Sequence, residues 1–335
     1  MQRPRPGRRW FLVGVASVAI WNLARRPAAS EDATLIEEDW SEGHLAGTLA
    51  RPAQVTKRGP AALIISGSGP TPRDGNYDTY KLIARGLAAA GIRSLRYDKR
   101  GVGKSRALVV REDDLIVQTF ADDVVLAAAS LAKRDDVSSL ILVGHSEGAL
   151  LAILAAKRTP IAGIVLLACA GRRLDVLMRE QIAAIPLPAD QEHSRAESYA
   201  ILDRLAHGER VTDMSAEQAK LFRPSVQPFL ISAFAIDPAA ELAKLETPVL
   251  IVWGESDIQV RRSDFDALVA ARPDARTLIL PATNHMFKPA PREIADRAAQ
   301  LQSYDRAAPL TPDLIPGIVD FIGGRIRPAG QNHAQ

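Results

Sequence analysis

One stretch decides how this chain folds: residues 139–149 read Ser-Leu-Ile-Leu-Val-Gly-His-Ser-Glu-Gly-Ala. Ser139–Val143 is a short apolar run typical of a buried strand, and Ala149–Arg158 has helical spacing. Between them, residues 144–148 have the spacing G-x-S-x-G, and the two glycines leave room for a sharp strand-to-helix turn. Such a turn exposes the hydroxyl of Ser146 next to the free N–H groups of a helix start. An ordinary glycine-flanked turn is the alternative, but this context predicts that Ser146 is a nucleophile.

The same alternation of apolar strand and helix continues on both sides of this stretch. Further strands are expected at Ala61–Ile65, Ile92–Asp98, Ile161–Ala170, Pro248–Trp253 and Arg276–Leu280. Further helices are expected at Tyr77–Ala90, Phe120–Lys133, Phe265–Arg272 and Leu314–Ile322, the last of them stopping at Gly323-Gly324. This order predicts an α/β fold with a mostly parallel, doubly wound sheet. Before it, Thr34–Glu38 and Leu45–Arg51 indicate an opening hairpin around Glu42-Gly43.

The alternation stops between Gly171 and Glu246, where no strong strand is found. Helices are expected there at Leu174–Ile185, Ala196–His207 and Ser215–Phe222. We therefore expect a core made of residues 31–170 and 247–326, with residues 171–246 as a helical cap over the carboxyl ends of the strands. Open α/β sheets bind ligands at that edge. The tail, residues 327–335, is expected to be disordered.

A serine hydroxyl needs an adjacent base to become a nucleophile at neutral pH. The chain has six histidines, at positions 44, 145, 193, 207, 285 and 333. His145 adjoins Ser146, but its side chain is expected to point away from the serine. Only His285 follows a late strand, in the loop Pro281-Ala282-Thr283-Asn284-His285. We therefore predict that His285 is the general base.

An acid is expected after the preceding strand, where it can hold the imidazole tautomer and stabilise its positive charge. Asp257 lies in Gly254-Glu255-Ser256-Asp257, directly after the strand at residues 248–253. The resulting chain order of serine, aspartate and histidine is one that recurs in serine hydrolases. Glu255 is a weaker candidate for the acid, and Asp175 is a third.

Attack on a carbonyl carbon creates an oxyanion, which needs donors placed in advance. One expected donor is the backbone N–H of Glu147, the residue after the nucleophile. The other is expected from the glycine-rich loop Ser66-Gly67-Ser68-Gly69 after an early strand, with Ser68 N–H preferred and Gly67 next. A simple turn is the alternative for this loop.

Several segments together are similar to one known group. They are Ser66-Gly67-Ser68-Gly69-Pro70 with Arg73-Asp74-Gly75-Asn76, Tyr97-Asp98-Lys99-Arg100-Gly101-Val102-Gly103-Lys104-Ser105, Leu221-Phe222-Arg223-Pro224-Ser225-Val226-Gln227-Pro228, Asp257-Ile258-Gln259-Val260 and Asn284-His285. Over residues 60–325 the chain resembles the α/β-hydrolase superfamily, and within it the bacterial carboxylesterases and serine-aminopeptidase-like hydrolases. The resemblance implies the α/β-hydrolase fold and carboxylesterase activity on a small-molecule ester.

Other activities remain open on the same triad. An aminopeptidase needs carboxylates for the substrate amine, and Glu180, Asp190, Glu192 and Glu197 are available in the cap. A thioesterase, and a catalytically inactive hydrolase fold that acts as a binding protein, are further alternatives. No metal motif is present and no cofactor is expected. The residues expected to line a pocket under the cap are Leu174, Met178, Leu221, Phe222 and Phe229.

The charge of the chain is concentrated at its start. The sequence has 335 residues and a pI near 9.1, but six of its 42 basic residues are arginines within residues 1–30. The rest of the chain has 36 basic and 39 acidic side chains, so no nucleic-acid partner is expected. The single cysteine, Cys169, cannot form an internal disulfide.

The first thirty residues have the pattern of an export signal. Arg8-Arg9-Trp10-Phe11-Leu12 resembles the twin-arginine motif, and the apolar run Trp10–Leu23 is short for a bilayer span. Ala28-Ala29-Ser30 offers small residues for cleavage before Glu31. We expect a periplasmic or extracellular protein without stable membrane association after cleavage. An uncleaved membrane anchor is the alternative.

Overall fold

The computed structural model describes residues 35–54, 57–107, 111–186, 188 and 192–326. The predicted export signal at residues 1–30 and the predicted tail at residues 327–335 lie outside these described residues. Within the described ranges, no helix combines the length and the apolar character that a bilayer span requires.

Eight strands form one sheet in the order β1-β2-β4-β3-β5-β6-β7-β8. They are β1 Leu35–Glu42, β2 Leu45–Pro52, β3 Gly59–Ile65, β4 Arg93–Tyr97, β5 Val137–His145, β6 Gly163–Leu167, β7 Val249–Gly254 and β8 Arg276–Leu280. The pairs β1–β2 and β2–β4 are antiparallel, and every later pair is parallel. In the middle of the sheet, Leu63 of β3 is in register with Leu95 of β4 and Leu142 of β5. The predicted fold class, a mostly parallel sheet with an opening hairpin, is confirmed.

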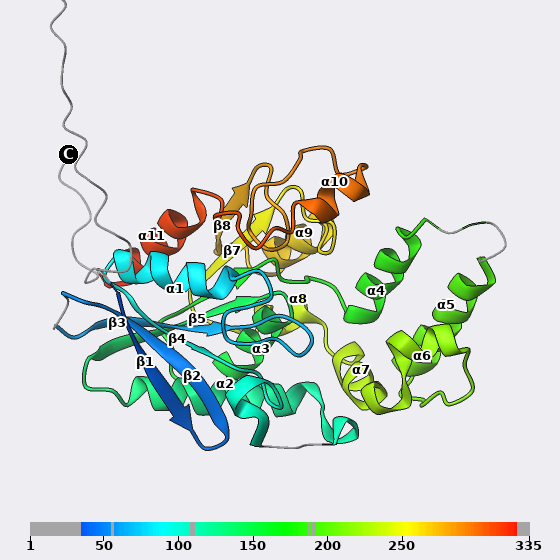
Figure 1. Ribbon diagram of the computed structural model, residues 1–335, viewed down its shortest axis with the longest axis horizontal. Coiled ribbons are helices and arrows are strands. Elements are labelled where there is room, and N and C mark those ends of the chain that lie inside the picture. Colours follow the sequence, from blue (N-terminus) through cyan, green and yellow to red (C-terminus); the bar gives the residue numbers. More distant parts are fainter. Residues whose placement is uncertain (1–34, 55–56, 108–110, 187, 189–191, 327–335) are drawn as a thin grey trace, which may run out of the picture.

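Helices cover both faces of the sheet (Figure 1). On one face, α1 Thr79–Ala89 and α11 Leu314–Ile326 share a hydrophobic cluster with residues such as Ile64, Val143 and Val252. On the other face, α2 Val117–Ala132, α3 Glu147–Ala156 and α9 Arg262–Ala271 pack over alternate residues of the same strands. Strands buried on both faces explain the continuous apolar runs in the sequence.

Four helices between β6 and β7 lie beside the sheet rather than on it, at the right of Figure 1. They are α4 Leu174–Ala183, α5 Glu192–Ala206, α6 Ala216–Phe222 and α7 Gln227–Phe234, and we call them the inserted helices. They have their own hydrophobic cluster, in which Leu202, Leu205, Phe222 and Phe234 are fully buried. The following helix, α8 Pro238–Ala243, instead places Leu242 in the cluster of α2, α3 and α9.

The shorter elements complete the chain. They are the 3-10 helices η2 Gly103–Ala107, η3 Glu112–Asp114 and η5 Pro224–Val226, and the helix α10 Arg297–Gln302. The sequence analysis did not predict α7, α8 or α10. Its predicted stop at Gly323-Gly324 is wrong, because α11 continues to Ile326. Neither glycine has the positive φ that ends a helix, so each is an interior residue with a modest propensity cost.

Candidate active site

Ser146 lies at the turn between β5 and α3, with φ 55° and ψ −120°. Non-glycine residues rarely adopt this conformation, and it persists only where the surrounding structure enforces it. Here the two motif glycines permit the close backbone packing that surrounds it. A Cβ on Gly144 would lie 2.3 Å from the carbonyl oxygen of Gly148, and a Cβ on Gly148 would lie 2.3 Å from that of Ile65. The tight packing explains why the sequence has glycine at both positions.

His285 and Asp257 form a buried pair on the loops that follow β8 and β7. His285 Nδ1 lies 2.6 Å from Asp257 Oδ2, and the two residues are 2% and 1% exposed. The other carboxylate oxygen, Asp257 Oδ1, accepts the backbone N–H groups of Gln259 at 2.7 Å and Val260 at 3.0 Å. These two donors fix the rotation of the carboxylate, so Oδ2 is directed at the histidine.

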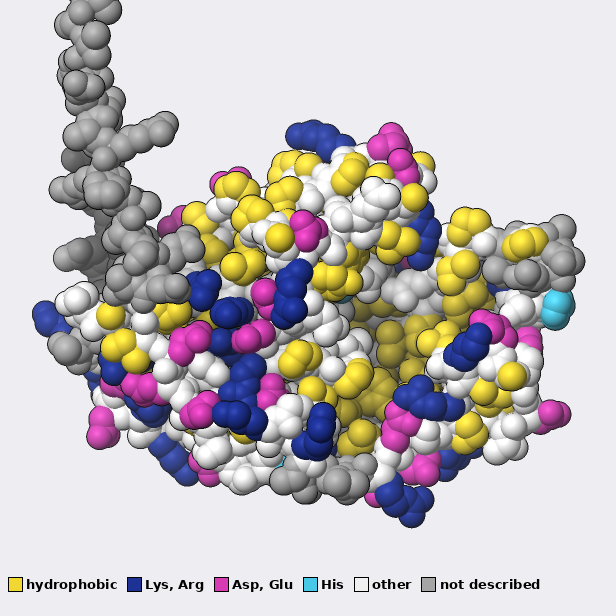
Figure 2. Space-filling view, viewed as in Figure 1, with side chains coloured by type: hydrophobic (Ala, Val, Ile, Leu, Met, Phe, Trp, Pro, Cys, Tyr) yellow, Lys and Arg dark blue, Asp and Glu magenta, His cyan; other side chains and the backbone are white. Residues whose placement is uncertain are grey.

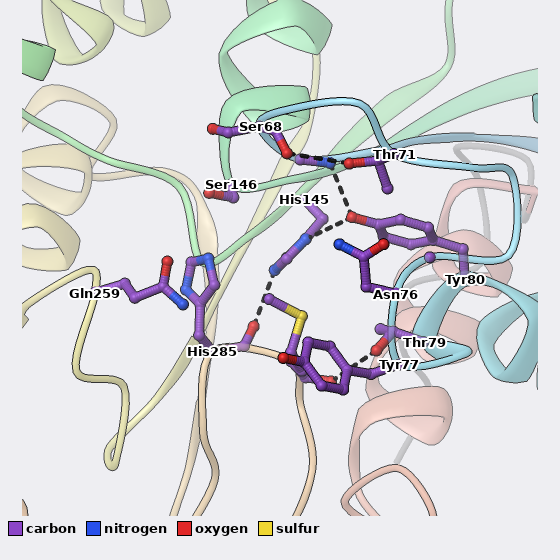
Figure 3. A pocket seen from close by; sticks show the side chains of 13 residues that line it. Ser68, Thr71, Asn76, Tyr77, Thr79, Tyr80, His145, Ser146, Gln259 and His285 are labelled. Carbon is purple, nitrogen blue, oxygen red and sulfur yellow. Dashed lines mark hydrogen bonds between the residues drawn. The ribbon is translucent and has the colours of Figure 1, made fainter. Parts of the chain in front are cut away.

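Ser146 and His285 line the same small cavity, which has a volume of about 110 Å³. Figure 3 shows the His285 ring turned toward Ser146, with Ser68 on the other side of the serine. The structure thus brings together the predicted nucleophile, base and acid from three different loops at the carboxyl edge of the sheet.

The two weaker acid candidates lie elsewhere. Glu255 is exposed to solvent. Asp175 pairs with Arg173 at 3.0 Å. Within the part of the chain that the structure describes, neither carboxylate contacts His285.

The loop that carries His285 is held by a residue whose structural role the sequence did not reveal. Asn284 Oδ1 accepts the backbone N–H groups of Met286 at 2.9 Å and Lys288 at 3.1 Å. Its amide nitrogen donates to the carbonyl oxygen of Ser303 at 3.0 Å. Asn284 is fully buried, so these bonds give the loop a single conformation around the histidine.

The predicted oxyanion donors differ in availability. Gly67 N–H already donates to the hydroxyl oxygen of Tyr80 at 2.8 Å. The backbone N–H groups of Ser68 and Glu147 find no acceptor among the described residues. The Ser68 carbonyl is fixed by the Thr71 hydroxyl, which donates to it at 3.0 Å. The geometry therefore favours Ser68 and Glu147 over Gly67.

Lys99 connects the two segments that carry these donors. Its ammonium donates to the carbonyl of Gly67 at 2.8 Å and to Glu147 Oε1 at 2.7 Å, and it lies over the ring of Phe120. Lys99 is 4% exposed, so this is a largely desolvated ion pair. Removing one partner of such a pair leaves the other charge buried and uncompensated. The sequence analysis placed Lys99 in a family-like turn but gave it no role.

A polar chain runs beneath the site from the oxyanion loop to His285 (Figure 3). The Tyr80 hydroxyl lies 2.9 Å from His145 Nδ1, and His145 Nε2 lies 2.9 Å from the backbone carbonyl of His285. A carbonyl only accepts, so Nε2 carries the proton and Nδ1 accepts from the tyrosine. Tyr80 in turn accepts from Gly67 N–H. His145, expected only to point away from Ser146, thus lines the same cavity and donates a hydrogen bond to the backbone of His285.

Burial keeps both members of this chain uncharged. Burial, followed by the charge on His285, lowers the pKa of His145 to about 3. Burial also raises the pKa of the Tyr80 phenol above its ordinary value. The tyrosine therefore keeps its proton and the histidine stays neutral throughout the working pH range of an ordinary enzyme.

Removal of the Tyr80 hydroxyl breaks this chain at its centre. In Tyr80→Phe, Gly67 N–H and His145 Nδ1 both lose their partner while they remain buried. We expect the free energy of unfolding to fall by about 1–3 kcal/mol, because a buried unsatisfied group retains its desolvation cost. Urea denaturation of the two proteins measures this difference. Tyr199→Phe on α5 is the matched control, since no hydrogen bond of its hydroxyl is found among the described residues, and equal losses in both variants would contradict the prediction.

The lowered pKa of His145 predicts a loss of stability in acid. The unfolded chain takes up a proton at this histidine below about pH 6.5, whereas the folded chain does not until about pH 3. The stabilisation is complete above pH 6.5 and is lost as the pH falls toward 3. The free energy of unfolding should therefore fall by about 2 kcal/mol between pH 7.5 and pH 5.0. Denaturation curves at the two pH values should show this difference, and His145→Gln should reduce it; an identical pH dependence in the variant would refute the assignment.

A second, larger cavity of about 580 Å³ opens on the other side of Ser146. It lies between the inserted helices and helices α2 and α3, where Figure 2 shows a hollow lined by apolar side chains. Of the residues predicted to line a pocket, Leu174, Met178, Leu221 and Phe229 line this one. Phe222 does not, because it is fully buried within the cluster of the inserted helices.

Two other groups of potential interest have no place in this chemistry. Cys169 is buried, and burial raises the pKa of its thiol, so it is not an activated nucleophile. No group of three or more histidine, cysteine, aspartate or glutamate side chains in the described ranges is arranged to hold a metal ion.

Comparison with known proteins identifies the family. The model of the alpha/beta hydrolase family matches residues 62–297, which include the serine turn, the aspartate and the histidine. The chain belongs to the alpha/beta hydrolase family. This hydrolase is also 29% identical over 240 residues to the esterase EstD of Thermotoga maritima, a match that covers 68% of this chain and 54% of EstD. It therefore spans only about half the length of that relative.

Solved structures with the same fold include other alpha/beta hydrolases. Est1E from Butyrivibrio proteoclasticus, bound to ferulic acid, aligns with a TM-score of 0.55 at 18% identity, covering 84% of this hydrolase and 95% of Est1E. A proline iminopeptidase from Mycobacterium smegmatis aligns with a TM-score of 0.55 at 16% identity, covering 87% and 98% of the two chains. At these identities the similarity concerns the fold alone.

Proposed function

We propose that this hydrolase is a serine carboxylesterase that works through an acyl-enzyme on Ser146. The observation that carries the proposal is the buried Asp257–His285 pair, whose imidazole lines one small cavity with Ser146. The serine itself is held at a strained turn beside the start of α3. The 29% identity to an esterase supports the same reaction class.

In the first half of this mechanism, His285 Nε2 takes the proton of the Ser146 hydroxyl while Oγ attacks the ester carbonyl carbon. The negative charge that develops on the carbonyl oxygen is accepted by the backbone N–H groups of Ser68 and Glu147. Asp257 stabilises the imidazolium and keeps its second nitrogen in place. The intermediate collapses when its carbon–oxygen bond to the alcohol breaks, and His285 passes its proton to the leaving oxygen.

The second half repeats these steps with water. His285 takes a proton from a water molecule, whose oxygen attacks the acyl carbon. The bond to Ser146 Oγ then breaks, and the proton returns to the serine. The products of this half are the carboxylic acid and free enzyme, and the two halves together consume only the ester and water.

An aminopeptidase is less well supported because the carboxylates that line the larger cavity, Glu112 and Glu147, are already paired with Arg223 and Lys99, and the predicted ones lie elsewhere. Glu180 is paired with Arg172 and Glu192 with Arg195, and both glutamates are exposed. Glu197 accepts from Ser215. None of these three lines either cavity beside Ser146, and Asp190 lies outside the described residues.

Parallel assays of an ester and an amide separate these two functions. The full-length chain should release p-nitrophenol from p-nitrophenyl butyrate with a kcat/KM at least about 10³-fold above that for release of p-nitroaniline from L-alanine p-nitroanilide. The reason is that both carboxylates lining the larger cavity, Glu112 and Glu147, already have a cationic partner, which a substrate amine would have to displace. Preferential cleavage of the anilide, lost when its amine is acetylated, would contradict the esterase proposal in favour of an aminopeptidase. A thioester of butyric acid in the same assay tests the thioesterase alternative.

A further inference from the structure

We infer that the preferred substrate joins a bulky, uncharged, hydrophobic acid to a small alcohol. The acid occupies the larger cavity under the inserted helices, and the alcohol occupies the smaller cavity beside His285. This inference rests on the proposed esterase function and specifies its substrate class.

The two cavities meet at the nucleophile. Ser68, Ser146 and Gln259 line both of them, so an ester bound at Ser146 extends into each. The larger cavity, about 580 Å³, falls within the range of small-molecule sites. The smaller one has about 110 Å³. The substrate must therefore be unequal in size on the two sides of its ester bond.

The positions of the catalytic groups determine which cavity takes the acid and which takes the alcohol. His285 must reach the leaving oxygen to give it a proton, and His285 lines only the smaller cavity. Glu147, whose N–H is the candidate oxyanion donor, lines only the larger one. With the carbonyl oxygen between Ser68 and Glu147, the leaving oxygen points to the smaller cavity and the acyl carbon chain to the larger.

The larger cavity suits an apolar acyl group. Its walls are formed by α2, α3 and the inserted helices. The apolar residues that line it include Val117, Phe120, Leu150, Leu174, Leu177, Met178, Leu221, Val226, Phe229 and Leu230. Apolar surface removed from water is the main source of binding free energy for such a group.

The charged residues of the same cavity are already paired. Arg172 pairs with Asp264 at 2.8 Å, Arg100 with Asp123, and Arg223 with Glu112. Lys99 pairs with Glu147, and Lys220 with Glu217 on its own helix. A second carboxylate or an amine on the acid would therefore lose its hydration without gaining a partner, so the acid is uncharged apart from its ester group.

The smaller cavity has a mixed lining that is more polar than that of the larger one. It is lined by polar side chains, among them Thr71, Asn76 and Thr79, together with Tyr77 and Met286. In Figure 3, Asn76, Tyr77 and Thr79 lie across the space from His285, whereas Thr71 lies beside Ser68. A short alcohol fits there, whereas a long alkyl alcohol would contact polar groups and exceed the space.

Two isomeric esters test this orientation in the wild-type protein. Methyl octanoate and heptyl acetate have the same composition, but they place their alkyl chain on the acyl side and the alcohol side respectively. Each methylene that is buried favours a substrate by roughly fourfold. We expect kcat/KM for methyl octanoate to be at least about 30-fold higher, as measured by acid release. Equal values, or a preference for heptyl acetate, would overturn the orientation.

A variant in the larger cavity links this preference to its walls. Met178→Trp adds volume from α4, so the ratio of kcat/KM for methyl octanoate to that for methyl acetate, measured by acid release, should fall at least about tenfold. Val176→Trp on the same helix is the matched control, because Val176 is 39% exposed and does not line the cavity. An unchanged ratio in folded Met178→Trp would contradict the assignment of this cavity to the acyl group.

The outcomes separate this inference from the proposed function. Hydrolysis of p-nitrophenyl acetate that depends on Ser146 supports the esterase mechanism whichever isomer is preferred. A reversed isomer preference overturns only the substrate class. Absence of Ser146-dependent hydrolysis with every ester overturns both.

Discussion

Ser146→Ala should lower kcat for p-nitrophenyl octanoate by about 10⁴- to 10⁶-fold. The variant keeps the oxyanion donors and both cavities but has no oxygen to form the acyl-enzyme. The residual rate reflects only substrate binding and oxyanion stabilisation, both of which persist without the triad. Release of p-nitrophenol under saturating substrate measures the change.

The fold should survive this substitution. Ser146 has φ 55°, and the chain already places alanine at a similar φ, 48° at both Ala168 and Ala282. Ser138→Ala is the matched control, since Ser138 is exposed on the same strand, β5. It should retain full activity. A folded Ser146→Ala protein within tenfold of wild-type kcat would exclude the serine as the nucleophile, and a binding or water-activating role would then explain the site better.

Asp257→Asn should lower kcat by about 10⁴-fold at neutral pH. The two backbone N–H groups of Gln259 and Val260 require an oxygen where Oδ1 now lies. The amide nitrogen of asparagine is therefore forced toward His285 and donates to Nδ1. That bond stabilises the tautomer with its proton on Nε2, which cannot accept the proton of Ser146. The size of the side chain is nearly unchanged, so the loss of activity is due to the wrong tautomer of His285 and not to a new cavity.

Glu255→Gln is the carboxylate-to-amide control for this variant. Glu255 is two residues away in the same loop and exposed, so its kcat should stay at the wild-type value. A large loss in Glu255→Gln together with an active Asp257→Asn would reverse the assignment of the acid. Urea denaturation of both variants checks that each one is folded.

The elements of the fold could be read from the sequence because their signals are local. A strand buried on both faces must be apolar throughout, and the strand predicted at Pro248–Trp253 differs by only one residue at each end from the fully buried β7. The serine turn was readable because two glycines and a serine must stand at fixed spacing. The helices α7 and α8 were missed because their sequences, near Gln227 and Pro238, are short and carry a proline in the first turn. Packing against neighbouring helices stabilises them, and this tertiary contribution has no local signature.

The candidate site was predictable in its residues but not in its connections. The order of Ser146, Asp257 and His285 along the chain gave their positions after successive strands. Nothing in that order indicated that Tyr80 and His145 link Gly67 to the base, or that Lys99 pairs with Glu147. These contacts join residues from 13 to 140 positions apart, and only the tertiary structure brings them together.

Identification of the acylated residue tests the central claim most directly. The full-length chain is mixed with excess p-nitrophenyl octanoate, quenched in acid within one turnover, digested and analysed by mass spectrometry. We predict one octanoyl group per chain, attached to the peptide that contains Ser146, with a matching burst of p-nitrophenol. Hydrolysis that proceeds while the acyl group is found on another residue, such as Cys169, or on none, would contradict the proposed mechanism.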